Sequence, residues 1–172
     1  MQELETERLC LEPIREHHAS EMVTVLKAES LYDFIPSNPP TIEELISRYK
    51  MWEKNLAPDG SEIWLNWAAR LKESGKLVGH FQSGIKVDST ESYIAYTVGA
   101  AFQRRGYSYE ALKCLCTYLR EQQNVKTIKA WIDTRNMASI SLVSKLGMRQ
   151  VAFVKDADRF KGNASDEYVF EF

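Results

Sequence analysis

The alternation of apolar and polar positions predicts strands and helices in a fixed order along the chain. Alternation over Arg8–Ile14 predicts a first strand, in which Pro13 indicates a sheet edge or a strand end. Apolar positions at helical spacing predict a helix over His17–Ala28. A second helix opens at Thr41–Glu44, a capping box whose Thr hydroxyl and Glu carboxylate satisfy free N–H groups, and Pro58-Asp59-Gly60 ends it.

The middle of the chain predicts three strands followed by a helix. The runs Ile63–Leu71 and Leu77–Val87 form a hairpin about the turn Glu73–Lys76. A further strand covers Ser92–Val98, after which the apolar period changes from two to 3.6. The helix that follows is expected to run to about Gln122.

The last third predicts one more strand and helix and then two closing strands. Lys126–Asp133 reads as a strand, and Asn136–Leu146 as a helix that Gly147 ends in a left-handed cap. Met148–Lys155 and Glu167–Phe172 are the closing strands. The order β-α-α-β-β-β-α-β-α-β-β indicates an α+β fold with a mixed sheet, because an antiparallel meander leads into β-α-β-α-β.

Composition narrows the class of protein without changing this picture. The chain of 172 residues has no linker-like stretch, so residues 1–172 are expected to form a single domain. A net charge of −2 argues against a nucleic-acid binder. Cys10, Cys114 and Cys116 lack disulfide spacing and are expected to be reduced thiols. With no apolar run at the N-terminus and none long enough to cross a membrane, we expect a cytoplasmic protein without membrane or metal.

The turn Gln103–Ser108 is the segment that carries candidate chemistry. It joins a strand to the start of a helix, where backbone N–H groups without partners and the helix dipole favour an anion such as a diphosphate. Gly106 permits close backbone approach, Ser108 is small, and Arg104 and Arg105 add positive charge. The alternative is a plain strand-to-helix turn with two solvated arginines, and spacing alone does not decide between them. A P-loop and a Rossmann turn both require glycines that this turn lacks.

Two motifs resemble those of the GNAT N-acetyltransferases. The cofactor signature Gln/Arg-x-x-Gly-x-Gly/Ala is matched by Gln103, Gly106 and Ser108, with Ser108 as a mild departure. Downstream, Asn136-Met137-Ala138-Ser139 and Lys145-Leu146-Gly147-Met148 are similar to the family's Asn-x-x-Ser…Lys-x-Gly-Phe segment. The opening Glu5–Pro13 is similar to the start of the RimJ/RimL-like, ribosomal-protein branch.

The resemblance implies a GNAT fold and acetyl-CoA as the co-substrate. That fold is a twisted, mostly antiparallel sheet of about seven strands with a splayed parallel pair, flanked by about four helices. The pantetheine arm would lie beside Tyr96-Thr97-Val98, where the Val98 N–H polarises the thioester. The implied cofactor-binding residues are Tyr96, Thr97, Val98, Gln103, Arg104, Arg105, Gly106, Tyr107, Ser108, Asn136, Ser139 and Lys145.

The implied catalytic group is Ser139. Many family members protonate the leaving thiolate with a Tyr seven positions after the motif Asn, but Val143 stands there in this chain. In the RimJ/RimL-like branch the motif Ser, here Ser139, is proposed for that role; the alternative is a hydroxyl that only bonds the local backbone. Some relatives place a base where Trp131 stands, so the base stays open among Asp133, Glu62 and His80.

Acceptor binding is assigned to aromatic residues of the Leu31–Pro40 loop and the following strand, namely Tyr32, Phe34, Trp64 and Trp67. Asp156, Asp158 and Asp166 could attract a cationic amine, although a solvated loop is the default interpretation of such a run. We therefore expect a monomer or homodimer that acetylates a primary amine, on a protein N-terminus or on a small molecule. A non-catalytic acetyl-CoA-binding module and an unrelated phosphate-ligand protein are the alternatives.

Overall fold

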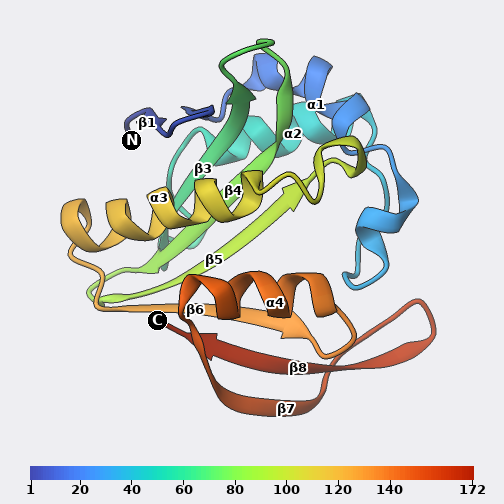
Figure 1. Cartoon of the computed structure of the whole chain (residues 1–172), viewed down its shortest axis with the longest axis vertical. Helices are drawn as coiled ribbons and strands as arrows, with labels where there is room; N and C mark the ends of the chain where they lie inside the picture. Colours follow the sequence, from blue (N-terminus) through green and yellow to red (C-terminus); the bar gives the residue numbers. More distant parts are fainter.

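The computed structural model describes residues 1–172 as one eight-stranded sheet flanked by four α-helices (Figure 1). The strands are β1 (Leu4–Glu5), β2 (Leu9–Pro13), β3 (Glu62–Leu71), β4 (Leu77–Lys86), β5 (Glu91–Val98), β6 (Thr127–Asp133), β7 (Arg149–Phe160) and β8 (Asn163–Glu171). The helices are α1 (Ala19–Val25), α2 (Ile42–Trp52), α3 (Tyr107–Gln122) and α4 (Met137–Leu146). Strand order is β1-β2-β3-β4-β5-β6-β8-β7, and every pair is antiparallel except β5–β6. The predicted mixed sheet with one parallel pair is confirmed.

The two faces of the sheet carry separate cores. Helices α3 and α4 cover one face, where their apolar stripes pack on side chains such as Trp67 and Phe81. Helices α1 and α2 cover the other face, where Met22, Leu45 and Tyr49 pack on Ala68 of β3. Strand alternation assigns each sheet residue to one of these two layers. No helix is long and apolar enough to cross a membrane.

Local signals place the helix ends. Thr41 Oγ1 accepts from the Glu44 N–H at 3.2 Å and the Glu44 carboxylate accepts from the Thr41 N–H at 2.9 Å, so the predicted capping box is confirmed. Gly147 ends α4 with φ 95°, as expected for a left-handed cap. Helix α2 ends at Trp52, well before the predicted stop at Pro58.

The predicted sheet of about seven strands is confirmed; the eighth strand is β1, which is only two residues long and too short to show a period. Two other predicted elements were wrong. The predicted helix over His17–Ala28 is a 3₁₀ turn over Glu16–His18 followed by α1, and the loop expected between Asp156 and Asp166 is part of a long hairpin. Lys161 and Gly162, with φ 51° and 78°, make the two-residue turn that closes it.

The parallel strands β5 and β6 diverge along their length (Figure 1). They pair only from Glu91 to Tyr93 on β5 and from Thr127 to Lys129 on β6. From Ile94 onward β5 has no partner on that side, although β4 continues to pair with it as far as Val98. The second half of β5 therefore presents an open backbone edge inside the sheet.

Candidate functional site

The open edge of β5 presents backbone groups of Tyr96 and Val98. The Gly99 N–H donates to the Val78 carbonyl on β4 at 2.8 Å. Because successive N–H groups of a strand point to opposite edges, Val98 and Tyr96 direct theirs toward the gap before β6. The backbone N–H and C=O groups of Thr97 face His80 of β4 instead. Gln103 Nε2 donates to the Val98 carbonyl at 3.2 Å and so holds the following turn against the end of β5.

The turn over residues 103–108, the predicted anion turn, presents backbone N–H groups without partners. A 3₁₀ turn over Ala100–Phe102 leads into Arg104 and Gly106, which have left-handed φ values of 60° and 83°, and α3 begins at Tyr107. None of the N–H groups from Arg104 to Tyr109 donates to an acceptor in the protein. Six adjacent free donors at a helix N-terminus suit a diphosphate. Arg104 and Arg105 are exposed beside them, and Ser108 is half-buried in the first helical turn.

Arg8 holds this turn in place. Its guanidinium bonds the Glu110 carboxylate at 2.7 Å and donates to the Arg105 carbonyl at 3.0 Å. It also lies 4.7 Å from the centroid of the Tyr107 ring, and Thr6 donates to the same carboxylate at 2.6 Å. Sequence reasoning missed this contact, although Arg8 lies inside the Glu5–Pro13 segment that resembles the family. Their separation of 102 residues left no local signal.

Helix α4 brings Asn136 and Ser139 to the same gap. Asn136 caps the helix, since its Oδ1 accepts from the Ser139 N–H at 3.1 Å. Ser139 is half-buried in the first turn of α4, on the face of the sheet to which Tyr96 also points. At the other end of α4, the Lys145 ammonium lies 4.8 Å from the Tyr109 ring centroid, on the side of the free N–H groups. The predicted cofactor residues thus converge from β5, α3 and α4.

The three candidate bases differ in their surroundings. Hydrogen bonds from Arg135, with Ser165 as a further donor, lower the pKa of Asp133 to about 2, so this carboxylate is a weak base. Burial lowers the pKa of His80 to about 4, and its ring packs edge-on against Trp52 beneath α2. Glu62 accepts from the Tyr93 hydroxyl at 2.9 Å and from Trp64 Nε1 at 3.0 Å. The lowered pKa values of Asp133 and His80 make both groups weak bases near neutral pH.

Glu167 is a base candidate that the sequence did not reveal. It pairs with Asp133 across β6 and β8, and alternation places Asp158 on the same face of the hairpin. Burial, followed by the charges of Asp158 and Asp133, raises the pKa of Glu167. Three carboxylates therefore gather beside the gap, on the face opposite α4, and the middle one binds a proton more readily than an ordinary glutamate.

Two of the four predicted acceptor residues are buried and hydrogen-bonded within the protein. Trp67 has no exposed surface, packs edge-on against Tyr118 under α3, and donates to the Gln2 carbonyl. Tyr32 is buried and its hydroxyl donates to the Leu26 carbonyl at 2.9 Å. Phe34 and Trp64 are only half-buried, and Arg135 lies over the Phe34 ring at 5.9 Å. These two aromatic residues border the same side of the sheet as the carboxylates.

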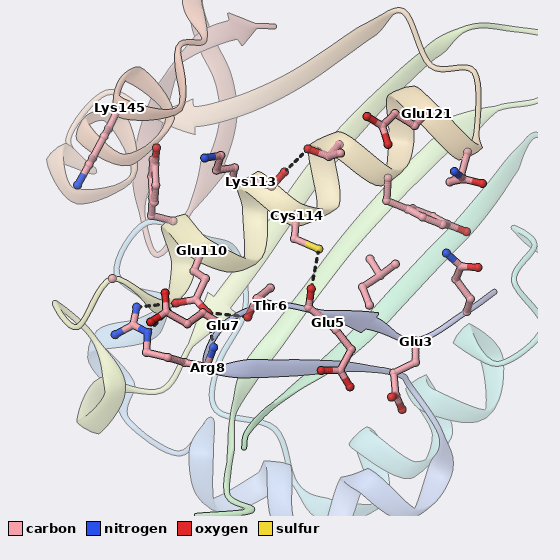
Figure 2. A pocket seen from close by; sticks show the side chains of 17 residues that line it. Glu3, Glu5, Thr6, Glu7, Arg8, Glu110, Lys113, Cys114, Glu121 and Lys145 are labelled. Carbon is pink, nitrogen blue, oxygen red and sulfur yellow. Dashed lines mark hydrogen bonds and ion pairs between the residues drawn. The ribbon is translucent and has the colours of Figure 1, made fainter. Parts of the chain in front are cut away.

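A cavity of about 880 Å³ lies away from the gap, between α3 and the N-terminal strands (Figure 2). Of the predicted cofactor residues it touches only Gly106 and Lys145, and five of its lining residues are glutamates. A wall of carboxylates disfavours a phosphorylated ligand, so we place the chemistry at the β5–β6 gap. Two of these glutamates, Glu3 and Glu5, approach Cys10. Burial, together with the neighbouring Glu3, raises the pKa of the Cys10 thiol to about 12, so the thiol is protonated near neutral pH.

Comparison with known proteins agrees with this geometry. The model of the acetyltransferase (GNAT) domain family matches residues 8–149. The uncharacterized N-acetyltransferase p20 of Bacillus licheniformis is 26% identical over 101 residues, 58% of this chain and 57% of that protein. The [ribosomal protein uS5]-alanine N-acetyltransferase of Escherichia coli (strain K12) is 27% identical over 79 residues, 46% of this chain and 41% of that protein. The chain thus spans about half the length of the curated relatives it matches.

A solved structure shows the same fold over nearly the whole chain. RimL, the ribosomal L7/L12 alpha-N-protein acetyltransferase in complex with coenzyme A, has a TM-score of 0.87 and 15% identity, covering 99% of this chain and 97% of that chain. The family match spans most of the sequence, including the anion turn and the start of α4. The chain belongs to the acetyltransferase (GNAT) domain family.

Proposed function

We propose that this protein transfers the acetyl group of acetyl-CoA to a primary amine by direct attack. The observation that carries the proposal is the row of six free N–H groups at the start of α3, placed beside the open edge of β5. The first feature suits a pyrophosphate and the second suits an extended amide chain such as pantetheine. Both belong to one coenzyme, and their adjacency favours it over an isolated phosphate ligand.

The gap supplies groups for both ends of the reaction. The Val98 N–H faces it and would stabilise negative charge on the thioester oxygen. Ser139, at the start of α4, would deliver a proton to the departing sulfur, and Asn136 holds the helix end that presents it. In this chain the same helix has the buried Val143 where many relatives carry a Tyr.

The acceptor would enter from the opposite face of the sheet. The carboxylates of Asp158 and Glu167 would attract a cationic amine, and the raised pKa of Glu167 suits a group that removes its proton. Phe34, which lies against Arg135, offers apolar surface near them, and Trp64 is half-buried farther along the same face. Free amines of peptide N-termini and small-molecule amines both satisfy this chemistry, so the acceptor is proposed as a class.

Two measurements test the function. Acetyl-CoA is expected to raise the melting temperature in proportion to the logarithm of its concentration, because it binds only the folded chain. Release of free thiol from acetyl-CoA should then accelerate with members of a panel of peptides and small amines. Tight binding without turnover on any amine would instead make the chain a non-catalytic acetyl-CoA-binding module. No thermal shift at all would point to an unrelated anion ligand.

Replacing Arg104 and Arg105 together by alanine is expected to raise the KM for acetyl-CoA roughly tenfold, or about 1.4 kcal/mol, with little change in kcat. Both side chains are exposed, so each contributes less than a buried charge would. Initial rates against acetyl-CoA concentration measure the effect, and raised ionic strength should reduce it. A variant of Lys126, a basic residue outside the anion turn, is the matched control. A fall in kcat alone would contradict the assignment.

A further inference from the structure

The Tyr96 hydroxyl is a buried polar group without a hydrogen-bond partner in the protein. Leaving such a group unpaired costs stability, since water would have satisfied it in the unfolded chain. A phenylalanine of the same shape would avoid this cost. Buried hydroxyls without partners therefore call for an explanation outside the stability of the fold.

The hydroxyl lies where the proposed chemistry takes place. Tyr96 stands on the open half of β5, and its ring stacks on Phe81 with centroids 6.2 Å apart. Alternation directs the side chain to the face covered by α3 and α4, the face from which Ser139 approaches the gap. Burial raises the pKa of Tyr96, Ser139 is the side chain that opposes this rise, and no charged group contributes.

We propose that Tyr96 is the proton source behind Ser139 when the thiolate leaves. This inference rests on the proposed acetyl transfer. The amine nitrogen forms a bond to the thioester carbon, the carbon–sulfur bond breaks, and its electron pair stays on sulfur. Sulfur takes the proton of Ser139, Ser139 takes that of Tyr96, and the tyrosinate regains one from solvent. The base on the acceptor side receives the proton that the nitrogen loses, so the products are an amide and a free thiol.

The relay compensates for the difference in acidity between a serine hydroxyl and the thiol that it must protonate. A serine hydroxyl alone is a poor donor to a thiolate, whose conjugate acid has a pKa of about 8.5. A phenol, with an ordinary pKa of about 10, is far closer, even when burial raises it. Because the Tyr96 hydroxyl makes no hydrogen bond within the protein, its O–H is free to donate when Ser139 gives up its proton. Together the two hydroxyls can deliver a proton to the thiolate: Ser139 makes the transfer, and Tyr96 supplies the more acidic proton.

Tyr96→Phe tests the proposal. We expect kcat to fall about 10²-fold, within the usual range for general acid catalysis, while the KM for acetyl-CoA stays within about threefold. The melting temperature should stay the same or rise, because the variant loses only an unpaired buried hydroxyl. Wild-type turnover is measured in the same assay, so failure of acetyl transfer itself is seen separately. A Tyr96→Phe variant that keeps wild-type kcat in an active wild-type background would overturn the relay.

Tyr49→Phe is the matched control. Tyr49 carries another buried hydroxyl without a partner, but it lies under α2 in the core of the opposite face. The same substitution there should leave kcat within about twofold and have a similar effect on stability. Equal losses of kcat in the two variants would also overturn the proposal, because the effect would not be particular to the gap.

A fluorinated tyrosine at position 96 separates proton donation from packing. The donor must be protonated, so kcat falls as the pH rises through the pKa of Tyr96, which burial holds above its ordinary value. Ring fluorination lowers the phenol pKa and keeps the hydroxyl. The alkaline fall in kcat should therefore move to lower pH in the fluorinated protein. An alkaline limb that stays in place would show that the hydroxyl has only a structural role.

Discussion

Ser139→Ala is expected to lower kcat about 10²-fold at saturating acetyl-CoA. The hydroxyl stands in the first turn of α4, and in the proposed reaction it would give a proton to the departing sulfur. Helix α4 should persist, because the Asn136 cap binds the backbone N–H of residue 139 and not its side chain. Thiol release under saturating conditions, with circular dichroism to monitor folding, measures the effect.

A double variant that lacks both the Ser139 and the Tyr96 hydroxyl makes this prediction more specific. If Ser139 and Tyr96 act as one relay, the double variant should be little slower than either single variant, because each already breaks the path. Ser144→Ala, at an exposed position later in α4, is the matched control and should keep full kcat. Ser139→Ala with unchanged turnover would remove Ser139 from the chemistry.

Gly79→Ala is expected to destabilise the fold by about 3 kcal/mol and to abolish most acetyl transfer. A Cβ at this position would lie 2.1 Å from the Thr97 carbonyl oxygen and 2.8 Å from the Val98 Cα. Both are backbone atoms of β5, so rotating a side chain cannot relieve the clash. The strands must separate at the residue whose N–H faces the gap, which displaces the proposed oxyanion donor. Denaturant unfolding and thiol release measure the two effects.

Gly60→Ala distinguishes this clash from a general effect of removing a glycine. Gly60 has a left-handed φ of 74° and open space where a Cβ would lie, so the cost is the backbone strain of about 1 kcal/mol alone. Its kcat should match the wild type, because the turn lies outside the gap. Equal losses of stability in the two variants would contradict the steric account of Gly79.

Much of the fold could be predicted because its signals are local. The capping box at Thr41, the left-handed end at Gly147 and the anion turn at Gly106 each depend on residues within about one helical turn. Strand alternation, also a local signal, likewise predicted the strands from β2 onward. The errors fell where local pattern is weakest, in the two-residue β1 and in the charged half of β7.

The candidate site divides in the same way. Its cofactor half is one continuous turn with a helix start, together with a second motif at the start of α4, and both were visible in the sequence. Its acceptor half was not. Trp64 and Trp67 stand three residues apart, so alternation places them on opposite faces. Only the position of α3 shows that Trp67 belongs to the core, while Trp64 stays half-buried on the other face.

The sequence by itself determined the order of elements, the helix caps and the anion turn, since these follow from torsion angles and hydrogen bonds between near neighbours. Tertiary structure alone decided the contact of Arg8 with Glu110, the burial of the unpaired Tyr96 hydroxyl and the carboxylate group around Glu167. Arg8 and Glu110 are 102 positions apart, and Asp133 and Glu167 are 34 positions apart. Their distances depend on how the sheet twists and where β5 leaves β6, which no short stretch of sequence encodes.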